Sequence, residues 1–242
     1  MENQIPLIVD RRGTVLTLTF NNISKKNALN SEMMGAMTAA IEESSNYEEL
    51  RAIVIRGEGS VFCSGADLNE WDPSQLQLLL RTIVDCSIPT IAEVHGACLG
   101  GGMGIICACD FIISKENTLF GFPEIRIGMI PAVILPYVSR KLTLSKIREL
   151  FITGVKFDNE AAKSFGLLYH DNKLSELISA IEKGAPQAQK KIKSLLNGGI
   201  LSKPMDERDI ELETLISAIK KGQECQEGIN SFMEKRKPRW VK

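Results

Sequence analysis

The sequence predicts an α/β fold built from repeated strand–strand–helix units, followed by a purely helical C-terminal region. Apolar strand patterns at 52–57 and 89–95 each lead into a turn of small residues and then into a helix. Further short strands follow the second helix, whereas no strand pattern returns near the C-terminus. These observations favour a ββα spiral over residues 1–185 and a separate helical region over residues 186–242, rather than a single doubly wound sheet.

The elements around the first turn follow from local patterns. Residues 8–20 alternate between apolar and polar side chains around a glycine, which predicts a β-hairpin at the edge of the core. A helix is expected over about 31–45, with Ser31 or Asn30 as its N-cap. A second helix is expected over 73–85, after the first glycine turn.

The second half of the chain is predicted to be mainly helical. Short strands are expected at 110–114 and 118–121. Helices are then expected at about 143–153, 159–166, 173–184, 186–196, 205–221 and 223–235. The last three are amphipathic, and residues such as Ile210 and Ile216 form an apolar face that a small helical extension cannot bury alone.

Composition excludes several classes of partner. The chain has 242 residues, of which 44% are hydrophobic, enough for a sizeable core. Its 29 basic and 30 acidic residues give a net charge of -1, so no overall field favours nucleic acid or a membrane surface. No apolar run approaches the ~20 residues needed to cross a bilayer, and no basic segment precedes an apolar one at the N-terminus. We therefore expect a soluble, cytoplasmic protein without nucleic-acid or membrane partners.

The cysteines and histidines predict neither a metal site nor disulfides. The six cysteines show no C-x-x-C spacing and lie mostly in apolar runs, as small core residues do. Cys63 lies near the first turn, where a nucleophilic role is an alternative, although no histidine lies nearby in the sequence to activate it. His95 ends an apolar strand, which favours a core histidine with a satisfied hydrogen bond.

Two turns carry the chemistry that the sequence predicts. Three glycines, at 100–102, open a helix and leave the backbone bare, so a ligand can approach unpaired N–H groups at the positive end of the helix dipole. The alternative is that they only permit a tight turn and close packing. The other turn, at 63–68, follows the strand at 52–57. Together the two turns can direct two backbone N–H groups at one oxygen.

These turns resemble those of the crotonase (enoyl-CoA hydratase/isomerase) superfamily. Ser64-Gly65-Ala66-Asp67-Leu68 is followed about 35 residues later by the three glycines, in the family's order and spacing. The segments 120–124, 130–131 and 232–240 extend the likeness over nearly the whole chain. The resemblance implies a crotonase (ClpP/crotonase-like) spiral whose C-terminal helices form a trimerisation region. It also implies a homotrimer or a dimer of trimers.

The resemblance further implies a site for a coenzyme A thioester, with coenzyme A as the substrate's carrier and no permanently bound cofactor or metal. The N–H groups of Ala66 and Gly101 would form an oxyanion hole, and Glu124 would act as acid or base. Implied contacts to coenzyme A come from Lys25, Lys26, Ala28, Ser64, Gly65, Ala66, Asp67, Leu68, Gly100, Gly101, Phe232 and Lys235.

Within that set, the two loop lysines, Lys25 and Lys26, would meet phosphates, whereas Phe232 and Lys235 would often reach coenzyme A in a neighbouring subunit. The alternative for these lysines is a solvated position in a loop or tail. Glu124 follows a proline in an apolar segment, and partial burial is expected to raise its pKa toward the working pH. The alternative is an ordinary carboxylate at a strand end.

The chain departs from the two-glutamate hydratases at Gly104, where those enzymes carry their first catalytic glutamate. It is similar here to a bacterial 3-methylglutaconyl-CoA hydratase-like branch, through the segments 100–105, 124–132 and 136–138. That branch implies a lyase that adds water to a 2-enoyl-CoA, such as 3-methylglutaconyl-CoA or a related short-chain thioester. The alternatives are a Δ3-Δ2 enoyl-CoA isomerase, with one glutamate as proton shuttle, and a non-catalytic acyl-CoA- or RNA-binding relative.

Overall fold

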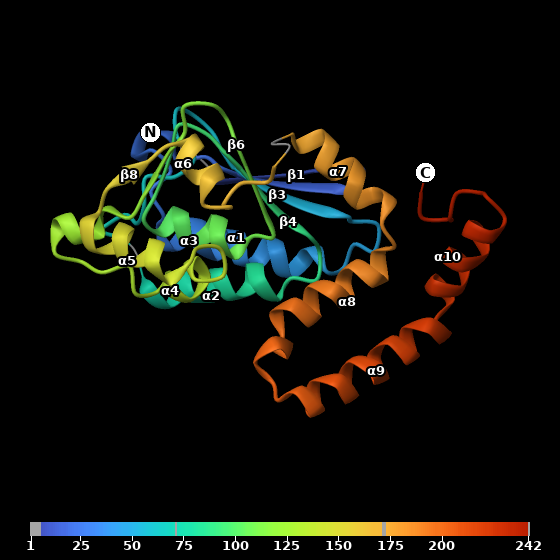
Figure 1. The fold of residues 1–242 in the computed structure, drawn as a ribbon. Helices are drawn as coiled ribbons and strands as arrows, with labels where there is room; N and C mark the ends of the chain where they lie inside the picture. Colours follow the sequence, from blue (N-terminus) through green and yellow to red (C-terminus); the bar gives the residue numbers. More distant parts are fainter. Residues whose placement is uncertain (1–5, 71, 171–172, 242) are drawn as a thin grey trace.

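The computed structural model describes residues 6–70, 72–170 and 173–241 and contains two β-sheets (Figure 1). The larger sheet has the order β1-β2-β3-β4-β6. Its strands are β1 (Leu7–Arg12), β2 (Val15–Phe20), β3 (Ala52–Gly57), β4 (Thr90–Val94) and β6 (Phe111–Ser114). The β1–β2 hairpin is antiparallel, as expected, and the other pairs are parallel. The smaller sheet contains β5 (Ala97–Leu99), β7 (Leu119–Gly121) and β8 (Lys156–Phe157).

The chain passes from one sheet to the other in each repeat. Strand β3 is followed by Cys63, which forms a parallel bridge with Cys98 of β5, and then by α2 (Pro73–Asp85). Strands β4 and β5 are likewise followed by α3 (Gly101–Ala108). This arrangement confirms the predicted ββα spiral.

The strand expected over 89–95 is β4, and a second strand that was not expected, β5, follows it in the other sheet. Strand β4 ends at Val94, and β5 pairs with β7 of the smaller sheet. Gly96 forms the corner between them with a φ of +63°, and a Cβ there would overlap the backbone of Ser60. Only glycine therefore fits this change of direction.

Three helices cover one face of the larger sheet: α1 (Ser31–Ser44), α2 and α3 (Figure 1). Asn30, rather than Ser31, is the N-cap of α1, because its side chain accepts a hydrogen bond from the Met33 N–H. Every residue of α3 is buried, so its first turn is held rigidly. On the opposite face, Leu177 and Ile181 of α7 (Leu174–Lys183) pack against residues of β3, β4 and β6.

The remaining core elements are short. They are η1 (Ile23–Lys25), η2 (Pro123–Ile127), α4 (Leu135–Val138), α5 (Leu144–Thr153) and α6 (Asn159–Ser164). The η2 turn was not predicted, whereas α5 and α6 lie close to their expected positions. Within the described ranges, no helix is both long and apolar enough to cross a membrane.

Helix α8 (Pro186–Asn197) lies directly against the core. Lys193 is 7% exposed, and its Nζ lies 2.7 Å from Oδ2 of Asp110 and donates to the Ile88 carbonyl at 2.8 Å. Arg51, also buried, donates to the carbonyls of Ile181 and Gly184 just before this helix. These charged contacts join α8 to the sheet. They do not test the domain boundary expected at residue 186, which stays a prediction.

Beyond α8, the chain forms an arm of η3 (Ile200–Ser202), α9 (Met205–Lys221) and α10 (Gln223–Met233) that leaves the core (Figure 1). The carboxylate of Glu224 accepts hydrogen bonds from the first N–H groups of α8, and Trp240 donates to the Lys183 carbonyl. The arm therefore returns to the core at its end. Helix α9 contributes no buried residue, and its Ile210 and Ile216 are 67% and 60% exposed.

Candidate active site

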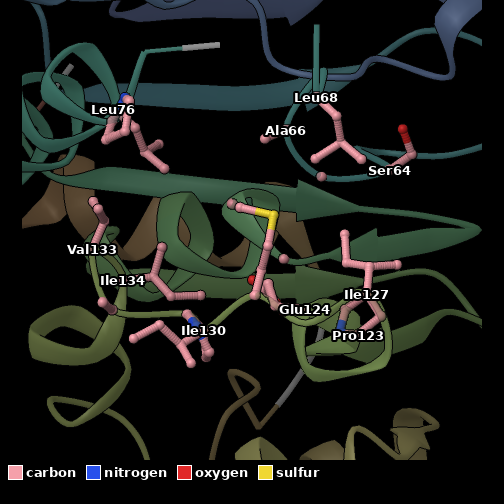
Figure 2. A pocket seen from close by; sticks show the side chains of 17 residues that line it. Ser64, Ala66, Leu68, Leu76, Pro123, Glu124, Ile127, Ile130, Val133 and Ile134 are labelled. Carbon is pink, nitrogen blue, oxygen red and sulfur yellow. The ribbon is translucent and has the colours of Figure 1, made fainter.

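A cavity of about 330 Å³ lies between the two glycine turns and the segment 123–134 (Figure 2). Ser64, Ala66, Gly100 and Gly101 contribute from the turns. In Figure 2, Glu124 lies between Ile134 and Ile127 on the opposite wall. The cavity thus lies where the two turns meet.

The smaller sheet holds the two turns side by side. Within the bridge between Cys63 and Cys98, the Cys63 N–H donates to the Ala97 carbonyl at 3.1 Å and the Leu99 N–H donates to the Cys63 carbonyl at 3.0 Å. A Cβ built on Gly101 would lie 4.0 Å from the Ala66 nitrogen. The backbones of the two turns are therefore in close contact.

Two backbone N–H groups beside the cavity have no hydrogen-bond partner among the described residues. Leu29 pairs with the neighbours of Ala66: its N–H donates to the Gly65 carbonyl, and its carbonyl accepts from the Asp67 N–H. That pairing turns the Ala66 N–H to the other side. The Gly101 N–H opens α3, where no intrahelical acceptor exists. Together the two groups can bind one negatively charged oxygen.

Glu124 lies beside these donors. A Cβ at Gly100 would lie 3.1 Å from Oε1 of Glu124, and the φ of +52° at Gly100 also disfavours a side chain there. Oε2 is buried and has no hydrogen-bond partner in the described structure. Burial raises the pKa of Glu124 above its ordinary value, opposed by a hydrogen bond from its own backbone. Glu124 is therefore better suited than an exposed carboxylate to take up and release a proton.

The position of the missing first glutamate is filled by apolar side chains. A Cβ on Gly104 would overlap Cγ2 of Ile134 and lie 3.3 Å from Cδ1 of Leu80. Ile134 is itself 2% exposed, so it cannot move aside without opening the core. Among the described residues that line the cavity, Glu124 is the only one with an ionisable side chain.

Of the two candidate phosphate ligands, Lys25 already has acidic partners. Its Nζ lies 2.8 Å from Oδ2 of Asp67 and 3.3 Å from Oε1 of Glu70. The hydrogen bond with Lys25 lowers the pKa of Asp67, and the pKa of Lys25 is raised by the same contact. Ser64 donates to the Lys25 carbonyl, which places this ion pair next to the cavity. Lys26 is exposed, and the Ala28 N–H donates to the Lys25 carbonyl in the same loop.

The other predicted contacts divide into two groups. Gly65, Leu68 and Gly100 line the cavity, together with Ala66 and Gly101. Phe232 and Lys235 do not line it: Phe232 belongs to α10 of the arm, and Lys235 follows that helix. Phe232 is 81% exposed. Within one chain, the structure therefore does not bring these two residues to the site.

Cys63 and His95 do not supply a nucleophile and its base. Burial raises the pKa of the Cys63 thiol to about 12, which favours the expected core role over the nucleophilic alternative. His95 is only half-buried, and its Nε2 lies 3.0 Å from the Gly59 carbonyl, so it is less enclosed than expected. In the parts of the chain that the structure describes, no cluster of three or more His, Cys, Asp or Glu residues could hold a metal ion.

Sequence reasoning missed most of the apolar wall. Leu76 of α2 and the residues Ile127, Met129, Val133 and Ile134 line the cavity but were not predicted as site residues. The segment 124–132 was noted only for its likeness to a family motif. The sequence did offer one signal for these lining residues: they follow Glu124 closely in the chain, so some of them were bound to lie beside the cavity that Glu124 faces.

Comparison with known proteins identifies the family of this chain. A sequence profile of the enoyl-CoA hydratase/isomerase family matches residues 10–242. Mevalonyl-coenzyme A hydratase of Aspergillus fumigatus is 28% identical, over 93% of this chain and 91% of the relative. The Arabidopsis thaliana protein named probable enoyl-CoA hydratase 2, mitochondrial, is 35% identical, over 88% of this chain and 77% of the relative.

Solved structures show the same fold. Pseudomonas aeruginosa AtuE superposes with a TM-score of 0.92 at 28% identity, covering 98% of this chain and 100% of that one. An enoyl-CoA hydratase from Shewanella pealeana gives a TM-score of 0.91 at 28% identity, covering 99% and 97% of the two chains. The chain therefore belongs to the enoyl-CoA hydratase/isomerase family and is an enzyme of the hydratase-lyase or isomerase type.

Proposed function

We propose that this protein adds water across the double bond of a 2-enoyl-CoA with a single carboxylate, Glu124. The observation that carries the proposal is the position of Glu124. Among the described residues, its buried Oε2 has no hydrogen-bond partner, and its Oε1 lies beside the glycine turn whose Gly101 N–H is also unpaired there. The hydratase names of the curated relatives support hydration as the first candidate.

In this mechanism, Glu124 serves as base and then as acid. Its carboxylate removes a proton from a water molecule while the water oxygen bonds to C3. The electron pair of the double bond moves through C2 onto the thioester oxygen, which the Ala66 and Gly101 N–H groups stabilise. Protonated Glu124 then donates its proton to C2. Loss of one oxyanion donor typically raises such a barrier by roughly 2.7–4 kcal/mol.

Isomerisation of a 3-enoyl-CoA is the second candidate, favoured by the filled space at Gly104. There Ile134 and Leu80 leave no place for a second carboxylate. A single glutamate suffices for isomerisation, since it takes a proton from C2 and returns it to C4. The same oxyanion donors would stabilise the intermediate.

We also propose that the active form is a trimer or a dimer of trimers. The arm supports this assembly, because Ile210 and Ile216 on α9 and Phe232 on α10 are all mostly exposed. Apolar faces of this kind are normally covered by another protein surface. Such packing would also give Phe232 and Lys235 a route to a neighbouring site.

Glu124→Gln should lower turnover by about 10²–10⁴-fold or more, because the amide keeps the shape but cannot accept the proton. Acyl-CoA affinity should be largely retained. Steady-state assays with crotonyl-CoA and with a 3-enoyl-CoA measure the loss, and Glu116→Gln, at an exposed position, is the matched control. Wild-type activity in Glu124→Gln on every active substrate would contradict both candidate reactions.

Reaction in deuterated water should distinguish the two candidates. Hydration should give a 3-hydroxyacyl product carrying one deuterium at C2, because the proton comes from water through Glu124. Migration of the double bond without net addition of water would identify an isomerase instead. Mass spectrometry and NMR of the products provide the measurement.

The same substitution should stabilise the fold at neutral pH. The folded-state pKa of Glu124 is raised, so its charged form destabilises the native state, and this penalty is fully present above that pKa. The penalty falls as pH decreases and vanishes below the unfolded-state value of about 4.3. Urea unfolding should therefore show Glu124→Gln to be more stable than wild type at pH 7.5 and equal to it at low pH. An equal difference at both pH values would contradict this account.

Truncation before Pro204 should leave aggregated or unfolded protein, because it removes the contacts of Glu224 with α8 and of Trp240 with Lys183 together with the surface through which chains associate. The milder change Ile210→Glu alters one exposed residue of α9 and should shift the full-length protein toward smaller species. Sedimentation velocity measures both effects. A monomeric truncated protein with full activity would refute the assembly.

A further inference from the structure

We propose that the acyl group accepted by this cavity is uncharged and apolar, so that thioesters with a terminal carboxylate are poor substrates. This inference rests on the proposed function and specifies its substrate class. Among the described lining residues, only Ser64 and Glu124 carry polar side chains, and the others are glycine, proline, alanine or larger apolar residues. The substrate class would exclude 3-methylglutaconyl-CoA, which the sequence resemblance suggested.

Within one chain, the described lining of the cavity includes no cation that could pair with a carboxylate. Arg126 lies two residues from Glu124 in the sequence, but its Nε donates to the Gly154 carbonyl at 3.1 Å, at the end of α5. Lys25 is held by Asp67 and Glu70. Neither basic residue lines the cavity. A charged acyl tail would therefore lose its hydration without gaining a partner, which is strongly unfavourable.

A second carboxylate would also interfere with Glu124. Like charges at short range disfavour ionisation of both groups. Burial already raises the pKa of Glu124, and a charged acyl tail beside it would raise that pKa further. A smaller fraction of Glu124 would then be ionised and able to act as the base. A carboxylated thioester is thus disfavoured both in binding and in the chemical step.

The shape of the cavity agrees with a short apolar chain. Leu76, Val133 and Ile134 lie on one side of it in Figure 2. Near the opening, Ile127 and Ile130 are 58% and 71% exposed and can be covered by bound substrate. A volume of about 330 Å³ is near the lower end of the roughly 300–1,000 Å³ range of ligand pockets.

The test compares two thioesters of matched shape. Glutaconyl-CoA carries a terminal carboxylate where (E)-5-methylhex-2-enoyl-CoA carries an isopropyl group. We expect kcat/KM for the apolar thioester to be at least about 100-fold higher, since an unpaired charge must be buried in the other case. Ile130→Lys should reduce this ratio by supplying a cation at the opening, whereas Ile130→Met, of similar length and neutral, should leave the ratio near that of wild type.

The possible outcomes separate this inference from the proposed function. Turnover of glutaconyl-CoA as fast as its apolar counterpart would overturn the inference while hydration stands. If no enoyl-CoA reacts, the proposed function fails, and calorimetry with the saturated pair still tests selectivity. Tighter binding of 5-methylhexanoyl-CoA than of glutaryl-CoA would then support an apolar site, and equal or weaker binding would contradict it.

Discussion

The proposed active site depends on the contact between two backbone turns that belong to successive repeats of the spiral. The bridge between Cys63 and Cys98 joins these turns, and the pairing of Leu29 with the first turn leaves the Ala66 N–H without a partner among the described residues. Because both donors are backbone groups, the fold itself supplies them, with no side chain required. In the proposed oxyanion hole, the burial of α3 would keep the Gly101 N–H fixed relative to Ala66 and so avoid a reorganisation cost when charge develops.

Around these donors, the described lining of the cavity contains one carboxylate, Glu124, and neither a second carboxylate nor a cation. The apolar contact of Ile134 with Gly104 removes the place of a second carboxylate, and no cation among the described residues faces the remaining one. The result is a carboxylate in a low-polarity environment, which favours its protonated form more than water does. One physical condition, burial without a partner among the described residues, thus underlies both the proposed catalytic role of Glu124 and the apolar substrate that we infer.

The sequence predicted those elements that depend on local patterns. Strand β3, helix α2 and helix α9 have the expected bounds, because their hydrophobic periods, prolines and glycines are local signals. Strand β5 was missed, since a strand of three residues forms only through its pairing with β7. The contacts of Ile134 with Gly104 and of Lys193 with Asp110 join distant parts of the chain, so no local pattern could indicate them. The candidate donors and Glu124 came from the family resemblance, because spacing alone left structural alternatives open.

The most direct test of this account is a crystal structure of Glu124→Gln with crotonyl-CoA bound. The account predicts that the thioester oxygen lies within about 3 Å of both the Ala66 and the Gly101 nitrogen atoms, with residue 124 facing C2 and C3 of the acyl group. A thioester oxygen bound away from both N–H groups, with the acyl chain still in the cavity, would contradict the central claim that the two turns form the oxyanion hole.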